Sequence, residues 1–225
     1  MTIARPLSRR AQFSGRQPIS ELMRLALARP DLISLAAGFV DQATLPVEAT
    51  RQASEALLAD YTRKGFFDGI GLRLPTICVR PGKPNKAASG FFSSIIREPL
   101  VGQEAILPVP RDVVHTHASP RSAVNFLIHA AGIDGSRVGP RRNLTMPGVG
   151  VMVQEQLDAL RRVGGDMALS FIKEVPDDTI WAIVKGWPTR FEARRARDLG
   201  FEAERNFDEI IHAHIDDELG GKLPQ

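Results

Sequence analysis

Apolar segments with the character of strands alternate with amphipathic helical segments from about residue 61 onwards. The segments that we interpret as strands are residues 71–80, 105–109 and 143–146. The segments that we interpret as helices are residues 90–100, 119–131, 151–163 and 207–219. Such alternation is typical of α/β folds, and the lack of an internal repeat excludes a solenoid. The sequence therefore predicts an α/β fold.

The first 60 residues follow a different pattern. A helix is predicted from Ser20 to the residue before Pro30, because a residue that precedes proline disfavours helical geometry. An apolar run follows at residues 31–38, and a second helix is predicted over residues 46–58, with proline at its start. We expect a helical N-terminal arm ahead of the α/β part.

Composition narrows the class of protein. Hydrophobic residues make up 43% and charged residues 24% of the 225, which is too apolar for a disordered chain. The 29 basic and 26 acidic residues leave a net charge of +3, so nucleic acid is not an expected partner. Cys78 is the single cysteine, which excludes an internal disulfide and thiolate metal sites. The longest apolar runs, such as residues 32–40, are far shorter than a membrane span, and the N-terminus lacks the apolar stretch of a signal peptide, so we expect a cytoplasmic protein.

Two stretches of the chain resemble different enzyme families. Residues 14–60 resemble the N-terminal arm of fold-type-I pyridoxal-phosphate aminotransferases of the aminoadipate kind. In that family the glycine that matches Gly38 lies near the substrate carboxylate, and the Schiff-base lysine lies far downstream. Nothing downstream in this sequence continues the resemblance, so we do not expect aminotransferase activity.

Residues 61–221 resemble the C-terminal half of the extended short-chain dehydrogenases, in the NAD-dependent epimerase/dehydratase family. The segments that carry this resemblance read YTRKGFFDGIGLRLPTICVRPGKPNKAASGFFSSIIREPL, HTHASPRSAVNFLIHAA, RRNLTMPGV and FDEIIHAHIDDELGG. The resemblance implies an incomplete Rossmann-type parallel sheet with a C-terminal substrate-binding subdomain. It also implies NAD as cofactor and, as substrate, a small sugar acid such as D-erythronate that is oxidised at a secondary hydroxyl.

The same resemblance assigns site residues by position. Pro81 follows the strand that lies beside the nicotinamide in the family, which makes it a cofactor-side residue. The positions where family members make substrate contacts are Asn85, Ser89, His115, His117 and Arg121. The family resemblance implies no metal.

Two parts of the family's chemistry have no counterpart in this sequence. Hydride transfer needs a site for the dinucleotide, a proton acceptor and a group that lowers the pKa of that acceptor. The resemblance implies that these are a glycine-rich turn, a tyrosine and a lysine four residues after it. The sequence has no G-x-G-x-x-G motif, and its single tyrosine, Tyr61, is followed by Lys64 at a spacing of three. We expect Tyr61 and Lys64 to be structural or surface residues. We also expect the catalytic residues to be missing and NAD binding to be weak. The chain reads as a fusion of an aminotransferase arm to a truncated dehydrogenase, joined near residues 56–61.

Two histidine pairs allow other interpretations. His115 and His117 are two apart, which on a strand places both side chains on one face. A metal site is conceivable there, but without a third ligand a substrate pocket is the preferred interpretation. His212 and His214 diverge on a helix, and we interpret them as part of a solvated turn.

Other features have plain structural interpretations. We interpret Gly164-Gly165 as the end of a helix, and Arg194, Arg195 and Arg197 as a basic helix face rather than a phosphate site. Trp181, Trp187 and Phe191 are expected in the core or at an interface.

The alternative function is a non-catalytic interaction module. With part of its sheet missing, the predicted strand at residues 71–80 would present an open edge, which is a template for pairing. The partner could be a second copy of the chain or a full-length relative, and we expect the chain alone to be marginally stable.

Overall fold

A computed structural model describes residues 47–82 and 87–223. The chain divides into two compact units, Met1–Ala53 and Ser54–Gln225. The predicted helix after Ser20 and the apolar run at 31–38 lie outside the described residues. The helix predicted over residues 46–58 is present as α3 (Val47–Arg63) and continues one turn further than expected. The strands of the described residues all belong to the second unit.

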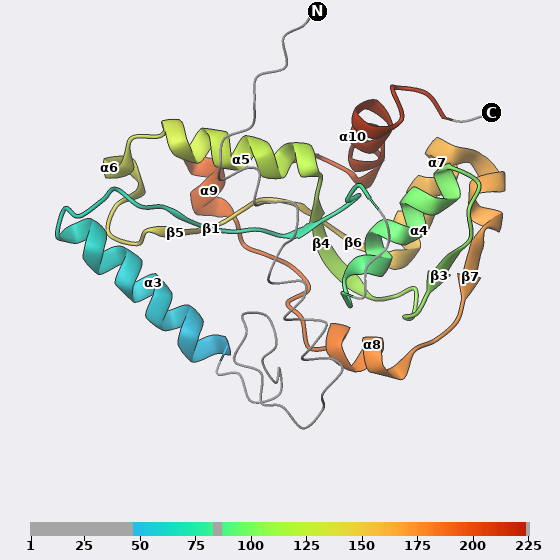
Figure 1. Cartoon of the computed structure of the whole chain (residues 1–225), viewed down its shortest axis with the longest axis horizontal. Helices are drawn as coiled ribbons and strands as arrows, with labels where there is room; N and C mark the ends of the chain where they lie inside the picture. The colour runs from blue at the N-terminus through green and yellow to red at the C-terminus, as the bar shows by residue number, and fades with distance from the viewer. Residues whose placement is uncertain (1–46, 83–86, 224–225) are drawn as a thin grey trace, which may run out of the picture. The chain divides into compact units, whose positions relative to one another are not determined.

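The predicted strand at residues 71–80 is instead two short strands, β1 (Gly71–Arg73) and β2 (Thr76–Ile77). They are separated by Leu74 and Pro75, and proline has no N–H to donate to a ladder. β1 pairs in parallel with β5 (Asn143–Thr145), and β2 pairs in parallel with β4 (Val114–Ala118). The segment therefore pairs with β5 before Pro75 and with β4 after it (Figure 1).

Two further pairings complete the described sheets. β6 (Val149–Met152) pairs with β4 in the antiparallel direction, with His115 opposite Val151. β3 (Ala105–Leu107) pairs in parallel with β7 (Ile172–Glu174). Three of the four pairings are parallel and helices connect the strands, so the predicted α/β fold with a parallel sheet is confirmed.

The helices of this unit agree with the predicted ones in most of their extent. Their bounds are α4 (Gly90–Leu100), α5 (Pro120–Gly132), α6 (Gly135–Val138), α7 (Val153–Ser170), α8 (Asp178–Val184), α9 (Arg194–Asp198) and α10 (Phe207–Glu218). The helix predicted at 151–163 begins later, because Val151 and Met152 belong to β6. Its predicted end at Gly164-Gly165 is a break inside α7, where Gly165 has a φ of 79°. A positive φ is accessible to glycine at little cost.

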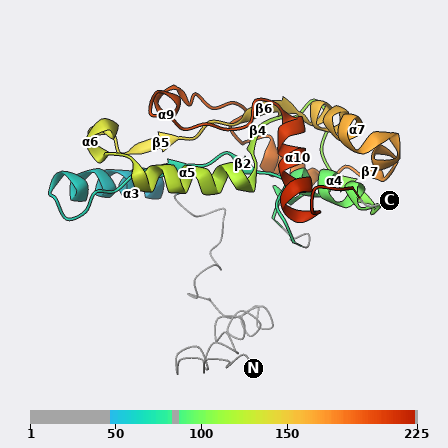
Figure 2. The same ribbon diagram turned by 90° about the horizontal axis from the view of Figure 1, so that it is seen from above.

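Two hydrophobic clusters hold the unit together. The larger joins α4, α7 and α10 through buried side chains such as Phe92, Ile95, Leu157, Leu160 and Ile211. The smaller joins α5 and β5 to the region of α9 through Phe126, Leu144, Met146 and Phe201. Viewed from above, α5 and β5 lie at one end of the unit and α4, α7 and α10 at the other (Figure 2). The two clusters therefore belong to two ends of one unit, connected through β2, β4 and β6.

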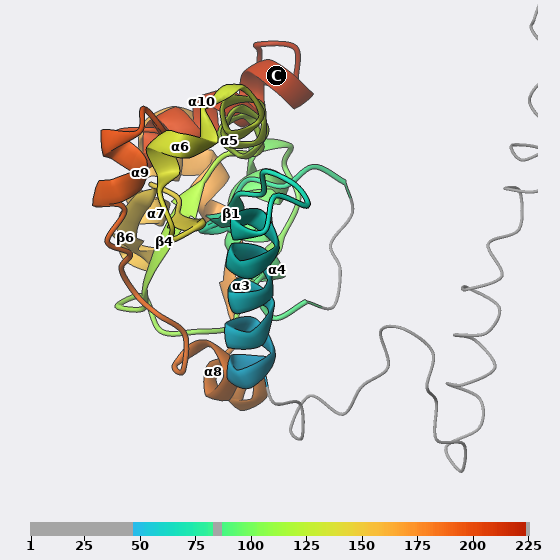
Figure 3. The same ribbon diagram turned by 90° about the vertical axis from the view of Figure 1, so that its left-hand side faces the viewer.

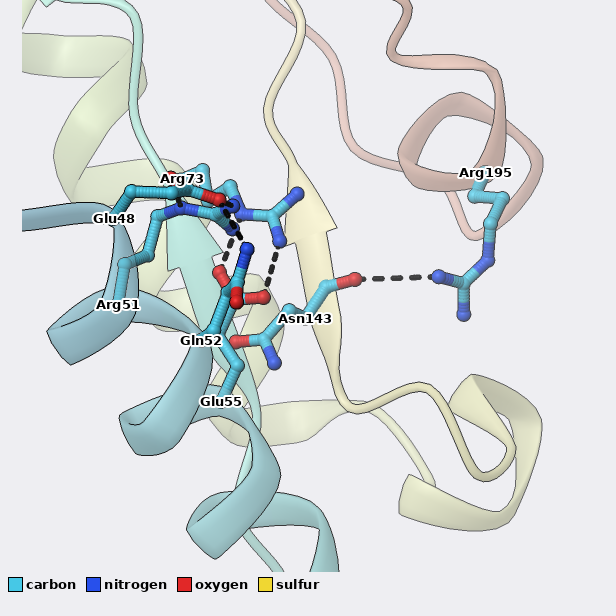
Figure 4. A network of polar contacts seen from close by, with 7 residues as sticks. All are labelled: Glu48, Arg51, Gln52, Glu55, Arg73, Asn143 and Arg195. Atoms are coloured by element: carbon cyan, nitrogen blue, oxygen red, sulfur yellow. Dashed lines mark hydrogen bonds and ion pairs between the residues drawn. The ribbon is translucent and has the colours of Figure 1, made fainter.

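β1 lies between two helices. The part of α3 from Ser54 onwards lies on one side of the strand and α5 on the other (Figure 3). The contact with α3 is close, because a Cβ added at Gly71 would lie 3.1 Å from Leu58 Cδ2. Arg73 Nε donates to Glu55 Oε1 of α3 at 2.8 Å, and Arg195 donates to the carbonyl of Asn143 on β5 at 3.2 Å (Figure 4). These polar contacts hold the C-terminal end of β1 to α3 and the N-terminal end of β5 to Arg195.

Candidate functional site

β4 carries the two histidines that the sequence assigns to the site. His115 and His117 are both buried, on the same face of the strand, with ring centroids 5.4 Å apart. The prediction that the pair shares one face is confirmed, and it follows from the two-residue period of a strand. Both rings face the larger hydrophobic cluster, where Phe92 of α4 lies parallel to His115 at 5.1 Å and edge-on to His117 at 4.8 Å.

Each histidine has a polar side chain beside its Nε2 atom. His115 Nε2 lies 2.6 Å from the hydroxyl of Thr76 on β2. His117 Nε2 lies 2.9 Å from the amide nitrogen of Gln156 on α7, and His117 Nδ1 has no partner among the described residues. The two rings thus connect β2, β4 and α7 inside the protein.

Burial keeps both imidazoles neutral. Burial lowers the pKa of His115 below its ordinary value, although a backbone hydrogen bond at Pro188 raises it in part. Burial lowers the pKa of His117 well below its ordinary value, and the neighbouring His115 lowers it further. A neutral ring that is 0% exposed, as His117 is, cannot touch a substrate directly in this conformation.

The other assigned residues lie in three places. Pro81 is exposed just after β2 and the buried pair Cys78 and Val79. Ser89 is half-buried at the start of α4, and its side chain makes no capping hydrogen bond. Asn85 lies outside the described residues. Arg121 is exposed on α5 and donates to Asp217 of α10 at 2.7 Å, so its guanidinium is already paired.

A hollow of about 520 Å³ lies beside Ser89. The first turns of α4 form one wall through Gly90, Phe91 and Ser94, and β3 forms another through Ala105 and Ile106. The third wall is the segment from β7 into α8. Most of this lining is apolar, as is usual for a pocket that holds a small molecule.

The charged groups in the described lining of this hollow are all acidic. They are Glu98, Glu104 and Asp177. Glu98 Oε1 accepts from Arg97 Nη2 at 2.5 Å, whereas Oε2 is buried and has no partner among the described residues. Asp177 caps α8 by accepting from the N–H groups of Thr179 and Ile180. This lining suits hydroxyl-bearing or apolar groups better than an anion.

Tyr61 and Lys64 lie at the end of α3 and do not line this hollow. Tyr61 is 45% exposed and contacts Phe66, with ring centroids 5.2 Å apart. Lys64 Nζ pairs with Asp60 at 2.7 Å. Both have the surface contacts expected of structural residues.

The N-terminus of α5 is occupied by a carboxylate of the same chain. Ser119 accepts from Ser122 N at 2.9 Å, as a capping residue does. The backbone N–H of Ser119 and the hydroxyl of Ser122 both donate to Glu204, at 3.3 and 2.8 Å. The positive end of this helix dipole is therefore already paired with an acid.

The remaining features flagged in the sequence have structural surroundings. His212 is exposed and His214 is buried, so the two diverge as predicted. The interpretation of both as part of a solvated turn is wrong for His214, which lies on the buried face of α10. Arg195 donates to the carbonyls of Val138 and Arg141 rather than to an open site. Trp181 and Trp187 pack against the larger cluster. Over residues 47–82 and 87–223, no group of three or more His, Cys, Asp or Glu side chains could hold a metal ion.

Sequence reasoning missed the hollow and its acidic group. Arg97 and Glu98 are the one charged pair in the otherwise uncharged segment GFFSSIIREPL. A charged pair in an apolar helix could have indicated a polar group in a pocket. The contact of Glu204 with α5 had no such signal, because it joins residues more than 80 positions apart.

Comparisons with known proteins agree with the dehydrogenase resemblance. No protein-family model matches the chain. The chain is 41% identical over 187 residues to a D-erythronate dehydrogenase of Haemophilus influenzae, which covers 83% of this chain and 59% of that protein. It is 45% identical over 163 residues to a D-erythronate dehydrogenase of Cupriavidus necator, which covers 72% of this chain and 50% of that one. Most of this chain is therefore similar in sequence to D-erythronate dehydrogenases.

The chain spans only about half the length of these D-erythronate dehydrogenases. Among solved structures, it is 62% identical to a nucleoside-diphosphate-sugar epimerase from Agrobacterium tumefaciens, with a TM-score of 0.76. That match covers 78% of this chain and 52% of the epimerase. An L-threonine dehydrogenase of Cupriavidus necator shares the fold at 19% identity and a TM-score of 0.66. The resemblance to the epimerase and dehydrogenase group is therefore confirmed, and with it the Rossmann-like fold.

Proposed function

We propose that this chain supplies the substrate side of an NAD-dependent oxidoreductase that acts on a secondary hydroxyl of a small sugar acid such as D-erythronate. The observation that carries the proposal is the hollow beside Ser89, in a chain that is 41–45% identical to D-erythronate dehydrogenases over 163 or more residues. Ser94 and the buried Glu98 offer groups that can bind sugar hydroxyls within apolar walls. The acid's own carboxylate is expected to lie outside this described lining.

The assigned residues fall into two proposed roles. Ser89 lies next to lining residues of the hollow and is proposed to contact substrate, together with Asn85. His115 and His117 are proposed to act indirectly, because they are buried against Phe92, whose neighbour Phe91 lines the hollow. Pro81 remains the proposed cofactor-side residue. Arg121 has the weakest support, because its guanidinium is paired with α10.

NAD is the cofactor that the resemblance to the epimerase/dehydratase family implies, and the residues that the structure describes do not fit its pyrophosphate. A pyrophosphate binds at the N-terminus of a helix that follows a strand, where glycines leave backbone N–H groups free. At α5, which follows β4 directly, Glu204 already accepts from the backbone N–H of Ser119 and the hydroxyl of Ser122, and it would repel an anion. The sequence has no G-x-G-x-x-G motif. We therefore propose that these 225 residues do not catalyse the oxidation by themselves.

Calorimetric titration tests the two halves of this proposal separately. We expect D-erythronate to bind the chain and NAD not to bind in the micromolar range. Ser89→Ala should weaken D-erythronate binding about tenfold, the usual loss for one polar contact. The control is Ser170→Ala, since Ser170 is exposed at the end of α7. Micromolar NAD binding together with NADH formation from D-erythronate would overturn the inactivity proposal, and equal D-erythronate affinity for both variants would remove Ser89 from the site.

The domain boundaries are also proposals. We propose that residues 1–60 form an arm like that of the aminotransferases and that residues 61–221 form the dehydrogenase-like part, in a cytoplasmic protein. A pyridoxal-phosphate absorbance band that borohydride fixes to a lysine would show that the arm retains more than a structural likeness. No helix in the described part of the chain is both long enough and apolar enough to cross a membrane.

A further inference from the structure

One edge of β1 and β2 has no strand partner within the described residues. β1 pairs only with β5, and β2 pairs only with β4. Gly71 N donates to Arg142 O, and Cys78 N donates to Ala118 O, which fixes the alternation of each ladder. In a parallel ladder, successive residues turn their N–H and C=O groups to opposite edges. The backbone groups of Leu72 and Ile77 therefore point to the open edge.

The two helices that flank β1 both expose apolar side chains. On α5, Val124, Leu127 and Ile128 are more than half exposed and follow the spacing of one helix face. On α3, Leu57 is 57% exposed and Tyr61 45%. Figures 1 and 3 show α5 and α3 on opposite sides of β1, so both helices adjoin the strand with the open edge. A group of exposed apolar side chains on one helix face, as on α5, is typical of an interaction site.

The geometry of the edge restricts what can cover it. Both β1 and β2 pair in parallel on their closed side, and helices lie on both faces of β1. Sheets with helices on both faces are continued by parallel strands that are apolar on both sides. A second copy related by a twofold axis would bring the same strand in the antiparallel direction. A second copy is therefore a poor fit.

The relatives indicate the occupant. The D-erythronate dehydrogenase of Cupriavidus necator has half its length, and the Agrobacterium epimerase 48% of its length, outside the match to this chain. We propose that the open edge of β1 and β2 and the adjoining faces of α3 and α5 form a docking surface for a polypeptide equivalent to that unmatched part. This inference rests on the proposed function, since it makes the chain one side of an enzyme completed in trans.

Co-expression tests the docking surface. The full 225-residue chain is produced with the part of the Cupriavidus necator D-erythronate dehydrogenase that has no counterpart in it. We expect the two polypeptides to co-purify at one to one, and the amides of Leu72 and Ile77 to gain protection from hydrogen exchange. Ile77→Pro removes an outward N–H without removing a ladder bond, and should lower recovery of the partner about tenfold.

Ile106→Pro is the matched control. Ala105 N donates to Phe171 O and Val175 N donates to Leu107 O, so Ile106 turns its N–H away from β7 just as Ile77 does from β4. This variant changes a different sheet and should leave recovery of the partner unchanged. An equal loss in both variants would mean that proline acts on folding and not on docking, and would overturn the inference.

Other outcomes identify other occupants. Protection of Leu72 and Ile77 in the chain alone, as a monomer, would show that the chain's own residues cover the edge. Protection in a homodimer would show a second copy. Either result, or lack of co-purification with rapid exchange at both amides, overturns the docking inference. Co-purification without NADH formation from D-erythronate would leave the docking surface standing and overturn the proposed function.

Discussion

Arg142 ties three separate loops together through its guanidinium. It is 5% exposed and donates to the carbonyls of Gly69 and Gly135 at 2.7 and 2.6 Å, and it also pairs with Asp68. Arg142→Ala leaves the carbonyls of the buried Gly135 and the half-buried Gly69 without this donor, whereas the exposed Asp68 stays solvated, so we expect the free energy of unfolding to fall by about 2 kcal/mol. Urea denaturation measures the change. Arg141→Ala is the control at an exposed neighbouring position. An equal effect there would show that the contacts of the Arg142 guanidinium do not contribute to stability.

The buried histidines make stability depend on pH. The folded-state pKa values of His115 and His117 lie below the ordinary value of 6.5, so below pH 6.5 the unfolded chain binds protons that the folded chain does not. The contribution of the two histidines to the free energy of unfolding is complete above pH 6.5. It is lost as the pH falls toward their folded-state pKa values. We expect the free energy of unfolding to drop by about 1.4 kcal/mol per pH unit for each such proton.

His117→Leu tests the origin of this pH dependence. The variant should unfold with a shallower dependence on pH between about 6.5 and 5, whatever its absolute stability. His212→Leu, at an exposed position of α10, should keep the slope of the unchanged chain. Urea midpoints of the unchanged chain and of both variants, measured across this pH range, give the pH dependence of stability for each protein. Equal slopes in all three proteins would show that His117 is not the group that titrates.

At the scale of single residues, the sequence predicts what a local period determines. The common face of His115 and His117 follows from the strand alone. The partners of Arg142 and the contact of Glu204 with Ser122 join residues more than 70 positions apart, except for Gly135. A local sequence pattern cannot predict such long-range contacts, because the residues next to each partner in the sequence do not depend on the contact.

At the scale of elements, two helices offer a matched test of capping. Ser119 precedes α5 and accepts from Ser122 N, whereas Ser89 precedes α4 and makes no capping bond. Ser119→Ala should lower the free energy of unfolding by about 1 kcal/mol, and Ser89→Ala should change it by no more than a few tenths. Thermal and urea unfolding provide the measurement. Equal losses would show that the serine hydroxyl at α5 is not what stabilises that helix end.

The length of an element decided whether the sequence could predict it. The helix predicted at residues 90–100 matches α4 at both ends, because Gly90 and the run of apolar residues define it locally. β6 and β7 have four and three residues, and their positions depend on pairing with β4 and β3. Pro75 is a signal that the sequence did contain, and it divides the predicted strand at 71–80 into β1 and β2.

At the scale of the whole molecule, the exposed stripe of α5 predicts how the unpartnered chain behaves. Val124, Leu127 and Ile128 present an apolar surface while the net charge of the chain is only +3 at pH 7, so repulsion between copies is weak. We expect concentration-dependent association that Leu127→Glu with Ile128→Glu shifts to about tenfold higher protein concentration. Static light scattering follows it. Asn125→Glu, paired with Ala131→Glu at a second exposed position of α5, adds the same two negative charges to this helix and keeps Val124, Leu127 and Ile128. If that control raises the protein concentration needed for association as much, charge and not the exposed apolar side chains governs the association. The apolar face of α5 would then not be a docking surface.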